Sequence, residues 1–224
     1  MSTLSRRLAA ELLGSCLLAG VVIGSGVMAT RLSDGNNAIA LLANTSATAA
    51  ILFVLITALG PISGAHFNPA VTLVMVLRRA TPPLDGVAYA LVQIAGCVLG
   101  AMLAHAMFDL PLLQESTTER GGFSQMLSES VATFALVAAI LLVSKTRESA
   151  VPAAVALTIA AGYWWTASTS FANPAITIAR ALSDTFAGIR PGDLLAFIVA
   201  QIAGALLAWM CCAFLHSGAA KPAR

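Results

Sequence analysis

Two asparagines, Asn68 and Asn173, carry the chemistry that this sequence can do. Each begins the tripeptide Asn-Pro-Ala at the head of an apolar run, and the two copies stand in opposite halves of the chain. Asparagine is a favoured helix N-cap, and proline at the first helical position has a suitable φ and loses no useful N–H. Each copy therefore predicts a helix start beside an amide that can donate hydrogen bonds. The residues concerned are Asn68, Pro69, Ala70, Asn173, Pro174 and Ala175.

The helices predicted from these starts are short, running from Asn68 to about Leu77 and from Asn173 to about Leu182. At about 1.5 Å of rise per residue, a helix of about ten residues spans half of a roughly 30 Å hydrocarbon core. Two such helices that meet at their N-termini would make one complete crossing. Both would also direct the positive ends of their dipoles at the same point.

The bulk composition is that of a membrane protein. Hydrophobic residues make up 58% of the chain and charged residues only 10%, whereas a soluble domain carries about 25% charged residues. Membrane lipid is therefore an expected partner, and nucleic acid is not, because the chain has no basic stripe. No catalytic set of residues is evident, so an enzyme is the least favoured class. No metal or cofactor is expected either, because the cysteines lie in apolar segments at spacings that match no metal site: Cys16, Cys97, Cys211 and Cys212.

Six apolar segments approach the length that crosses a bilayer. The first is too long for a typical signal peptide and is interpreted as a retained span. The two half-helices fall between the second and third segments and between the fifth and sixth. The six segments cover residues 8–29, 38–59, 85–108, 123–143, 150–168 and 192–215.

The two halves of the chain form a repeat. The sequence Gln-Ile-Ala-Gly begins at Gln93 in the first half and again at Gln201 in the second. Three spans per half is an odd number, so the second copy must enter the membrane upside down, and a functional site is expected at the midplane. The sequence thus predicts one channel domain over residues 1–224, with one repeat at about 1–110 and the other at about 120–216.

The distribution of basic residues predicts the orientation of the chain, because cytoplasmic segments are richer in lysine and arginine. With both termini inside, the cytoplasmic side carries Arg6, Arg7, Arg78, Arg79, Lys145, Arg147, Lys221 and Arg224, and the outer side carries Arg31, Arg120, Arg180 and Arg190. We therefore expect a multi-pass protein of a bacterial inner membrane with cytoplasmic N- and C-termini.

On these motifs the chain resembles the aquaporin family, also called major intrinsic proteins, over essentially its whole length. The resemblance rests on both Asn-Pro-Ala copies, Ser63 to His66 before the first, Glu11, Glu129 and the paired Gln-Ile-Ala-Gly segments. It implies an all-α membrane protein: a right-handed bundle of six transmembrane helices plus two re-entrant half-helices, assembled as a homotetramer with one pore per subunit. It also implies that each glutamate accepts hydrogen bonds from the backbone of a re-entrant loop; the alternative is that the glutamates lie near helix ends and reach interfacial water. His66 is expected to be a structural group at the cytoplasmic mouth, with a pH gate as the alternative.

The chain departs from that family where solutes are selected. Members that resemble it place an arginine three residues after the second asparagine, and here that position is Ile176. Ser170 and Thr48 match two further positions of the selectivity filter, and Tyr163 or Ala161 matches the fourth. Arg180 lies on the same face of the half-helix one turn further out. We expect it in the outer vestibule, where Asp184 is within reach; the alternative is an interfacial arginine. The expected filter residues are Thr48, Tyr163, Ser170 and Ile176.

A wide filter without a fixed charge predicts a passive channel for neutral small-molecule solutes. The sequence around Ile176 is similar to bacterial aquaglyceroporin-like channels associated with arsenic resistance. This resemblance implies glycerol, arsenite or methylated arsenite as neutral hydroxides, and water as solutes. The alternatives are an orthodox water channel, a secondary active transporter built on the inverted repeat, and a structural membrane protein with a closed pore.

Overall fold

The computed structural model describes residues 2–217, and within that range the secondary structure is entirely helical. The prediction of an all-α membrane protein is confirmed. Short 3₁₀ helices at Glu148–Ala150 and Pro191–Asp193 precede the sixth and eighth α-helices. The α-helices of the described range are α1 (Leu4–Leu32), α2 (Asn37–Ser63), α3 (Pro69–Leu77), α4 (Pro83–Met107), α5 (Phe123–Thr146), α6 (Val151–Trp165), α7 (Pro174–Ala181) and α8 (Leu194–Ser217).

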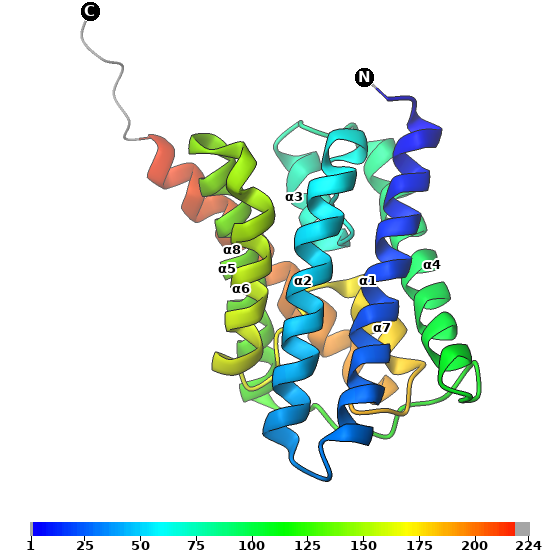
Figure 1. The fold of residues 1–224 in the computed structure, drawn as a ribbon. Coiled ribbons are helices and arrows are strands. Elements are labelled where there is room, and N and C mark those ends of the chain that lie inside the picture. The colour runs from blue at the N-terminus through cyan, green and yellow to red at the C-terminus, as the bar shows by residue number, and fades with distance from the viewer. Residues whose placement is uncertain (1, 218–224) are drawn as a thin grey trace, which may run out of the picture.

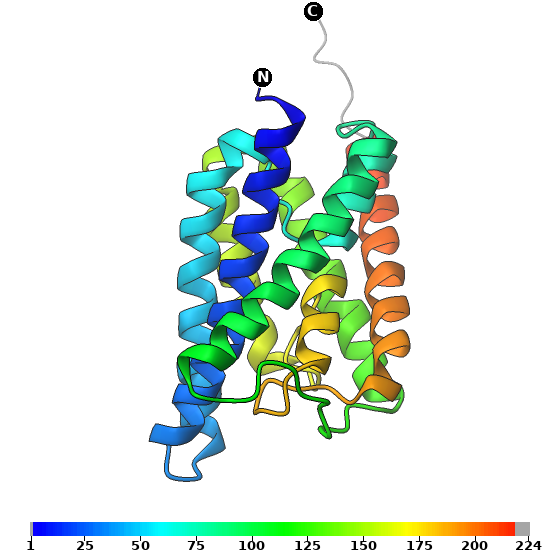
Figure 2. The ribbon, with the colours of Figure 1, turned by 90° about the vertical axis from the view of Figure 1, so that its right-hand side faces the viewer.

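The long helices stand side by side as a bundle, and the two short ones lie within it (Figure 1). The first and last described residues lie at the same end, called here the near end, and the hairpin between α1 and α2 lies at the opposite or far end. Helix α3 occupies the near half of the bundle and α7 the far half (Figure 2). The basic residues Lys221 and Arg224, used above to predict the orientation, lie outside the described residues.

The helix packing follows the repeat. Helix α1 packs against α2 and α4, and α5 packs against α6 and α8. Contact between α2 and α6 joins the halves, while α3 and α7 each touch both α4 and α8. A Cβ at Gly96 would collide with the backbone carbonyl of Leu12, and one at Gly204 with that of Ser130. The missing side chains therefore let α4 approach α1, and α8 approach α5, at equivalent places.

The half-helices begin where the sequence predicts. Asn68 and Asn173 are the N-caps, and each side-chain oxygen accepts hydrogen bonds from the first backbone N–H groups of α3 or α7. Proline occupies the first helical position in both. Helix α3 has nine residues and α7 has eight, so each spans less than half of a bilayer core and neither can cross it alone.

Helix α6 is shorter than the predicted span over residues 150–168. It has 15 residues, and the five other long helices are the ones with the length and apolarity to cross a membrane in the described chain. Thr166 is extended, with φ −112° and ψ 142°, and its hydroxyl donates to the Gly162 carbonyl at 2.7 Å. The chain leaves the helix there because it must turn back into the bundle to reach Asn173.

Candidate functional site

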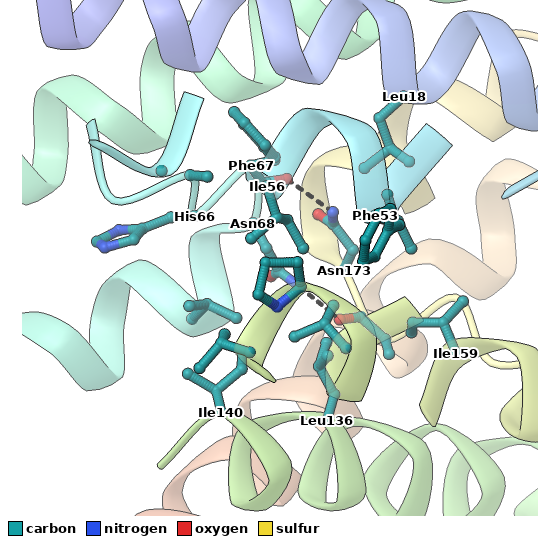
Figure 3. A pocket seen from close by; sticks show the side chains of 18 of the residues that line it. Leu18, Phe53, Ile56, His66, Phe67, Asn68, Leu136, Ile140, Ile159 and Asn173 are labelled. Carbon is teal, nitrogen blue, oxygen red and sulfur yellow. Dashed lines mark hydrogen bonds between the residues drawn. The ribbon is translucent and has the colours of Figure 1, made fainter. Parts of the chain in front are cut away.

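The two Asn-Pro-Ala copies meet inside the bundle. The side-chain Nδ2 of Asn68 donates to the backbone oxygen of Ala172 at 2.7 Å, and Nδ2 of Asn173 donates to that of Phe67 at 2.8 Å. Figure 3 shows these two hydrogen bonds side by side. Each side-chain oxygen faces its own helix, so the amide nitrogens face the opposite copy. Because a primary amide has two N–H groups, each asparagine keeps one donor for another oxygen.

Glu11 holds the first re-entrant segment from within α1. Its carboxylate accepts hydrogen bonds from the backbone N–H groups of His66 at 3.0 Å and Phe67 at 2.7 Å, and from the Ser63 hydroxyl at 2.6 Å. The side-chain amide of Gln93 donates to the same carboxylate at 2.8 Å. Glu11 is fully buried, so these donors replace the water that its charge would otherwise require.

Glu129 holds the second re-entrant segment in the same way. It accepts from the backbone N–H groups of Phe171 and Ala172, both at 2.9 Å, and from the Gln201 amide at 2.6 Å. Gln201 also donates to the Thr177 hydroxyl of α7, as Gln93 does to Thr72 of α3. The two glutamates thus sit at equivalent places, and each ties a re-entrant segment to a spanning helix.

The residue before each asparagine adopts a left-handed backbone. Phe67 has φ +48° and Ala172 has φ +47°. Such values are uncommon outside glycine and carry strain. They aim the carbonyl groups of Phe67 and Ala172 at the opposite asparagine, so the strain accompanies the hydrogen bonds that join the two copies.

A cavity of about 840 Å³ passes the asparagine pair. It runs from Arg78 and Glu148 near one end to Arg180 at the other. Its wall is mainly apolar, and Figure 3 shows the asparagines among aliphatic side chains of neighbouring helices. The labelled aliphatic side chains that line it are Leu18, Ile56, Leu136, Ile140 and Ile159.

The four residues predicted for the filter come together at the far part of this cavity. Thr48, Tyr163, Ser170 and Ile176 all line it and are all at least 95% buried, with exposed fractions of 3%, 4%, 3% and 4%. The hydroxyl groups of Thr48 and Tyr163 lie 3.3 Å apart, within hydrogen-bond distance. Of the two alternatives for the fourth position, Tyr163 faces the cavity, whereas Ala161 is exposed on the outside of α6.

Arg180 also lines the cavity, beyond Ile176. Its side chain is only 3% exposed, its Nε donates to the Ala187 carbonyl, and its guanidinium carbon lies 3.2 Å from the centre of the Phe171 ring. The expected approach to Asp184 is wrong: that carboxylate accepts hydrogen bonds from the backbone and hydroxyl of Thr117 instead. The connecting segment before α5 competes for Asp184, and the sequence of α7 alone does not reveal that segment.

The comparisons with known proteins agree with this geometry. The profile of the family described as Major intrinsic protein matches residues 1–167. Aquaglyceroporin AqpS of Rhizobium meliloti (strain 1021) is 54% identical, over 92% of this chain and 88% of that protein. The chain belongs to the Major intrinsic protein family. It is therefore an integral, multi-pass membrane channel and not an enzyme.

More distant members of the Major intrinsic protein family match as well. Probable aquaporin AqpM of Archaeoglobus fulgidus is 29% identical, over 93% of this chain and 96% of that protein. The X-ray structure of the aquaglyceroporin from Plasmodium falciparum superposes with a TM-score of 0.72 at 19% identity, covering 96% of this chain and 97% of that one. The aquaporin-like fold expected from the sequence is confirmed.

His66 lies beside the first re-entrant segment of this channel. Its Nδ1 is 3.1 Å from the Thr72 hydroxyl, and its ring is 5.3 Å from the ring of Tyr89. Figure 3 shows the ring directed away from the asparagine pair. The ring also lines the cavity, so its position combines packing with access to the near part of the pathway.

Sequence reasoning missed part of the far end of the channel. It recognised Gln93 and Gln201 only as a repeat, and their amide contacts with the glutamates follow from the repeat once the helices are paired. It gave no role to Phe171 and used Arg120 only to predict the orientation of the chain, whereas the guanidinium carbon of Arg120 lies 4.9 Å from the Phe171 ring centre. No local pattern marks Arg120, because it lies in the irregular segment between α4 and α5.

Proposed function

We propose that the protein is a passive channel for small uncharged polar solutes, with glycerol, neutral arsenite or methylated arsenite hydroxides, and water as the candidates. The observation that carries this proposal is the pair of asparagine amides at the junction of α3 and α7, on the wall of a cavity with Ile176 beyond them. The names of the aquaglyceroporin relatives support the same class of solute.

The electrostatics of the junction favours neutral solutes. Each half-helix carries roughly half a positive charge at its N-terminus, and both N-termini lie at the junction. A cation meets an unfavourable potential there, while the free amide N–H of Asn68 or Asn173 donates to the oxygen of water or of a hydroxyl compound. The buried carboxylates of Glu11 and Glu129 are occupied by loop N–H groups, which favours a channel over an ion-coupled transporter.

The filter residues support a wide passage. Ile176 brings no charge to the position, and Thr48, Tyr163 and Ser170 offer hydroxyl groups around it. A compact polyol needs room and hydrogen-bond partners rather than a positive clamp. We assign Arg180 to the outer vestibule at the far end of this passage, Glu11 and Glu129 to support of the loops, and His66 to the near mouth.

The proposal also covers the membrane in which the channel lies, its orientation and its oligomeric state. The bacterial relative favours a bacterial inner membrane, and the basic residues near the starts of α1 and the ends of α3 and α5 favour a cytoplasmic near end. Both termini would then be cytoplasmic. We propose a homotetramer with one pore per subunit, which cross-linking in membranes or native mass spectrometry would test.

Stopped-flow light scattering on proteoliposomes tests the solute class. The measurement compares water, glycerol and arsenite permeability for the wild type, Ile176→Arg and the conservative control Ile176→Val. We expect rapid glycerol and arsenite flux without saturation or ion dependence. Ile176→Arg should suppress both by about ten-fold or more relative to water, because a guanidinium narrows the passage, whereas Ile176→Val should not. Flux of water alone, or no flux above empty liposomes, would refute the proposed solute class.

A further inference from the structure

The far end of the cavity holds two arginines around one aromatic ring. The guanidinium carbon of Arg180 lies 3.2 Å from the centre of the Phe171 ring, and that of Arg120 lies 4.9 Å from it. Phe171 is 4% exposed and immediately follows Ser170 of the filter. Its ring also stacks edge-on against Phe197 of α8 at 5.1 Å, which holds the ring in place.

Arg120 reaches this ring from a distant part of the chain. Its Nε donates to the Gly188 carbonyl at 2.7 Å, and one terminal nitrogen donates to the Ser168 carbonyl at 3.4 Å. Its backbone N–H donates to Asp193 at 2.8 Å. The segment before α5 is therefore fastened to the segments on both sides of α7, and Figure 2 shows these connecting segments together at the far end. Burial lowers the pKa of Arg120, and the charge of Glu129 acts in the opposite direction; the guanidinium stays charged at neutral pH.

Neither arginine has a carboxylate partner in the described chain. The ion pairs among residues 2–217 join Arg7 to Asp85, and Arg190 to Glu119 and Asp193. Two buried carboxylates nearby are occupied by other donors: Glu129 accepts from the loop N–H groups and Gln201, and Asp193 accepts from the backbone N–H of Arg120 and from the Arg190 side chain. Arg180 uses only Nε for a hydrogen bond within the described residues, so its remaining N–H groups are available at the cavity wall.

Resting on the proposed channel function, we infer that Arg120 is a specificity-determining residue, whose positive charge acts with Arg180 to exclude cations at the far end. The Arg120 guanidinium lies outside the cavity wall, so it supplies positive charge, which Ile176 lacks, without narrowing the passage. A neutral solute interacts weakly with this charge. A cation in the cavity is repelled by both guanidinium groups across a mainly apolar wall, where charges interact more strongly than in bulk water. Arg120 thus separates two properties, width and charge, that a filter arginine combines.

The test measures methylammonium and glycerol permeability of proteoliposomes at low ionic strength for wild type, Arg120→Gln, Arg120→Lys and Arg190→Gln. Arg120→Gln removes the charge and retains an amide donor. We expect it to raise methylammonium permeability by about five-fold, an effect that shrinks in high salt. Glycerol permeability should stay within about two-fold, because the neutral solute does not respond to the charge.

The controls separate charge from structure. Arg120→Lys keeps the charge and should exclude methylammonium as the wild type does. Arg190→Gln removes an exposed charge that is already ion-paired and should change neither flux. If Arg120→Lys leaks like Arg120→Gln, the guanidinium contacts rather than the charge matter, and the inference is wrong. It is also wrong if Arg120→Gln excludes methylammonium normally while glycerol flux persists. Absence of wild-type glycerol flux would instead overturn the proposed function, and the inference with it.

Discussion

The two half-helices place similar aliphatic residues on the cavity wall in their first turn and different residues in their second turn. Val71 of α3 and Ile176 of α7 both line the cavity three residues after the asparagine. One turn later, α3 contributes Met75 whereas α7 contributes Arg180. The cavity wall at the junction is therefore nearly symmetric, and the two half-helices first differ in charge one turn away from the junction.

The arginines beside the two re-entrant segments also differ: the one at the near end is ion-paired, and the two at the far end are not ion-paired to any described residue. At the near end, Arg7 lies over the ring of Tyr89 at 5.7 Å and is ion-paired to Asp85. At the far end, Arg120 and Arg180 lie over Phe171 without such a partner among the described residues. The comparison shows that the glutamate support of the re-entrant loops occurs in both halves, whereas a pair of arginines without an ion-pair partner among the described residues occurs at the far end. A passive pore can thus have a duplicated frame and still distinguish its two mouths.

Removing the duplicated support should have the largest effect, and an equal one in both halves. Glu11→Ala and Glu129→Ala each leave at least three buried donors without an acceptor. An unsatisfied buried donor costs about 1–3 kcal/mol, so each variant should lose on the order of 3 kcal/mol or more. Thermal unfolding in detergent and the yield of folded protein measure this loss. A large effect in one variant and none in the other would show that the two halves are not supported alike.

Making the second turn of α7 resemble that of α3 should have an intermediate effect. In Arg180→Met the far end loses its guanidinium donors, and glycerol permeability should fall by about ten-fold, since a hydrogen bond to a charged group contributes about 1.5 kcal/mol. Met75→Leu is the matched control on α3 and should change glycerol flux little. Proteoliposome flux measures both. Unchanged solute selectivity in a well-folded Arg180→Met variant would contradict the proposed role of Arg180 in the outer vestibule.

The smallest effect is expected from the hydroxyl pair that only the far end has. Tyr163→Phe removes the 3.3 Å interaction with Thr48 and leaves the aromatic ring in the cavity wall. A neutral hydrogen bond contributes about 0.5 kcal/mol at the low end of its range, where this 3.3 Å contact between two wall residues belongs, so glycerol permeability should change by no more than about three-fold. Tyr163→Ala, which opens the passage, is the contrasting variant and should alter solute size selection more. Flux of glycerol and a larger polyol distinguishes the two, and equal behaviour would mean that the ring does not bound the passage.

Local sequence predicted much of the arrangement that holds the two half-helices. The Asn-Pro-Ala tripeptides determined the starts of α3 and α7 because N-cap and first-turn preferences act within a few residues. Local sequence marked Glu11 and Glu129 as carboxylates in apolar spans that need donors, and the family resemblance supplied the re-entrant loops as those donors. The end of α6 at Trp165 did not follow, because Trp164 and Trp165 continue the apolar run, and only the return to Asn173 stops the helix.

The sequence by itself determined that the chain is a duplicated, inverted membrane fold whose two asparagines meet at the heads of short helices. Periodicity, composition and capping are properties of neighbouring residues, so they are readable without coordinates. The tertiary structure alone decided that Tyr163 rather than Ala161 faces the cavity. It also decided that Thr117 donates hydrogen bonds to Asp184 and that the Arg120 guanidinium packs over the Phe171 ring. Those outcomes depend on which irregular segments pack together, and residues far apart in the chain carry no local signal of their contact.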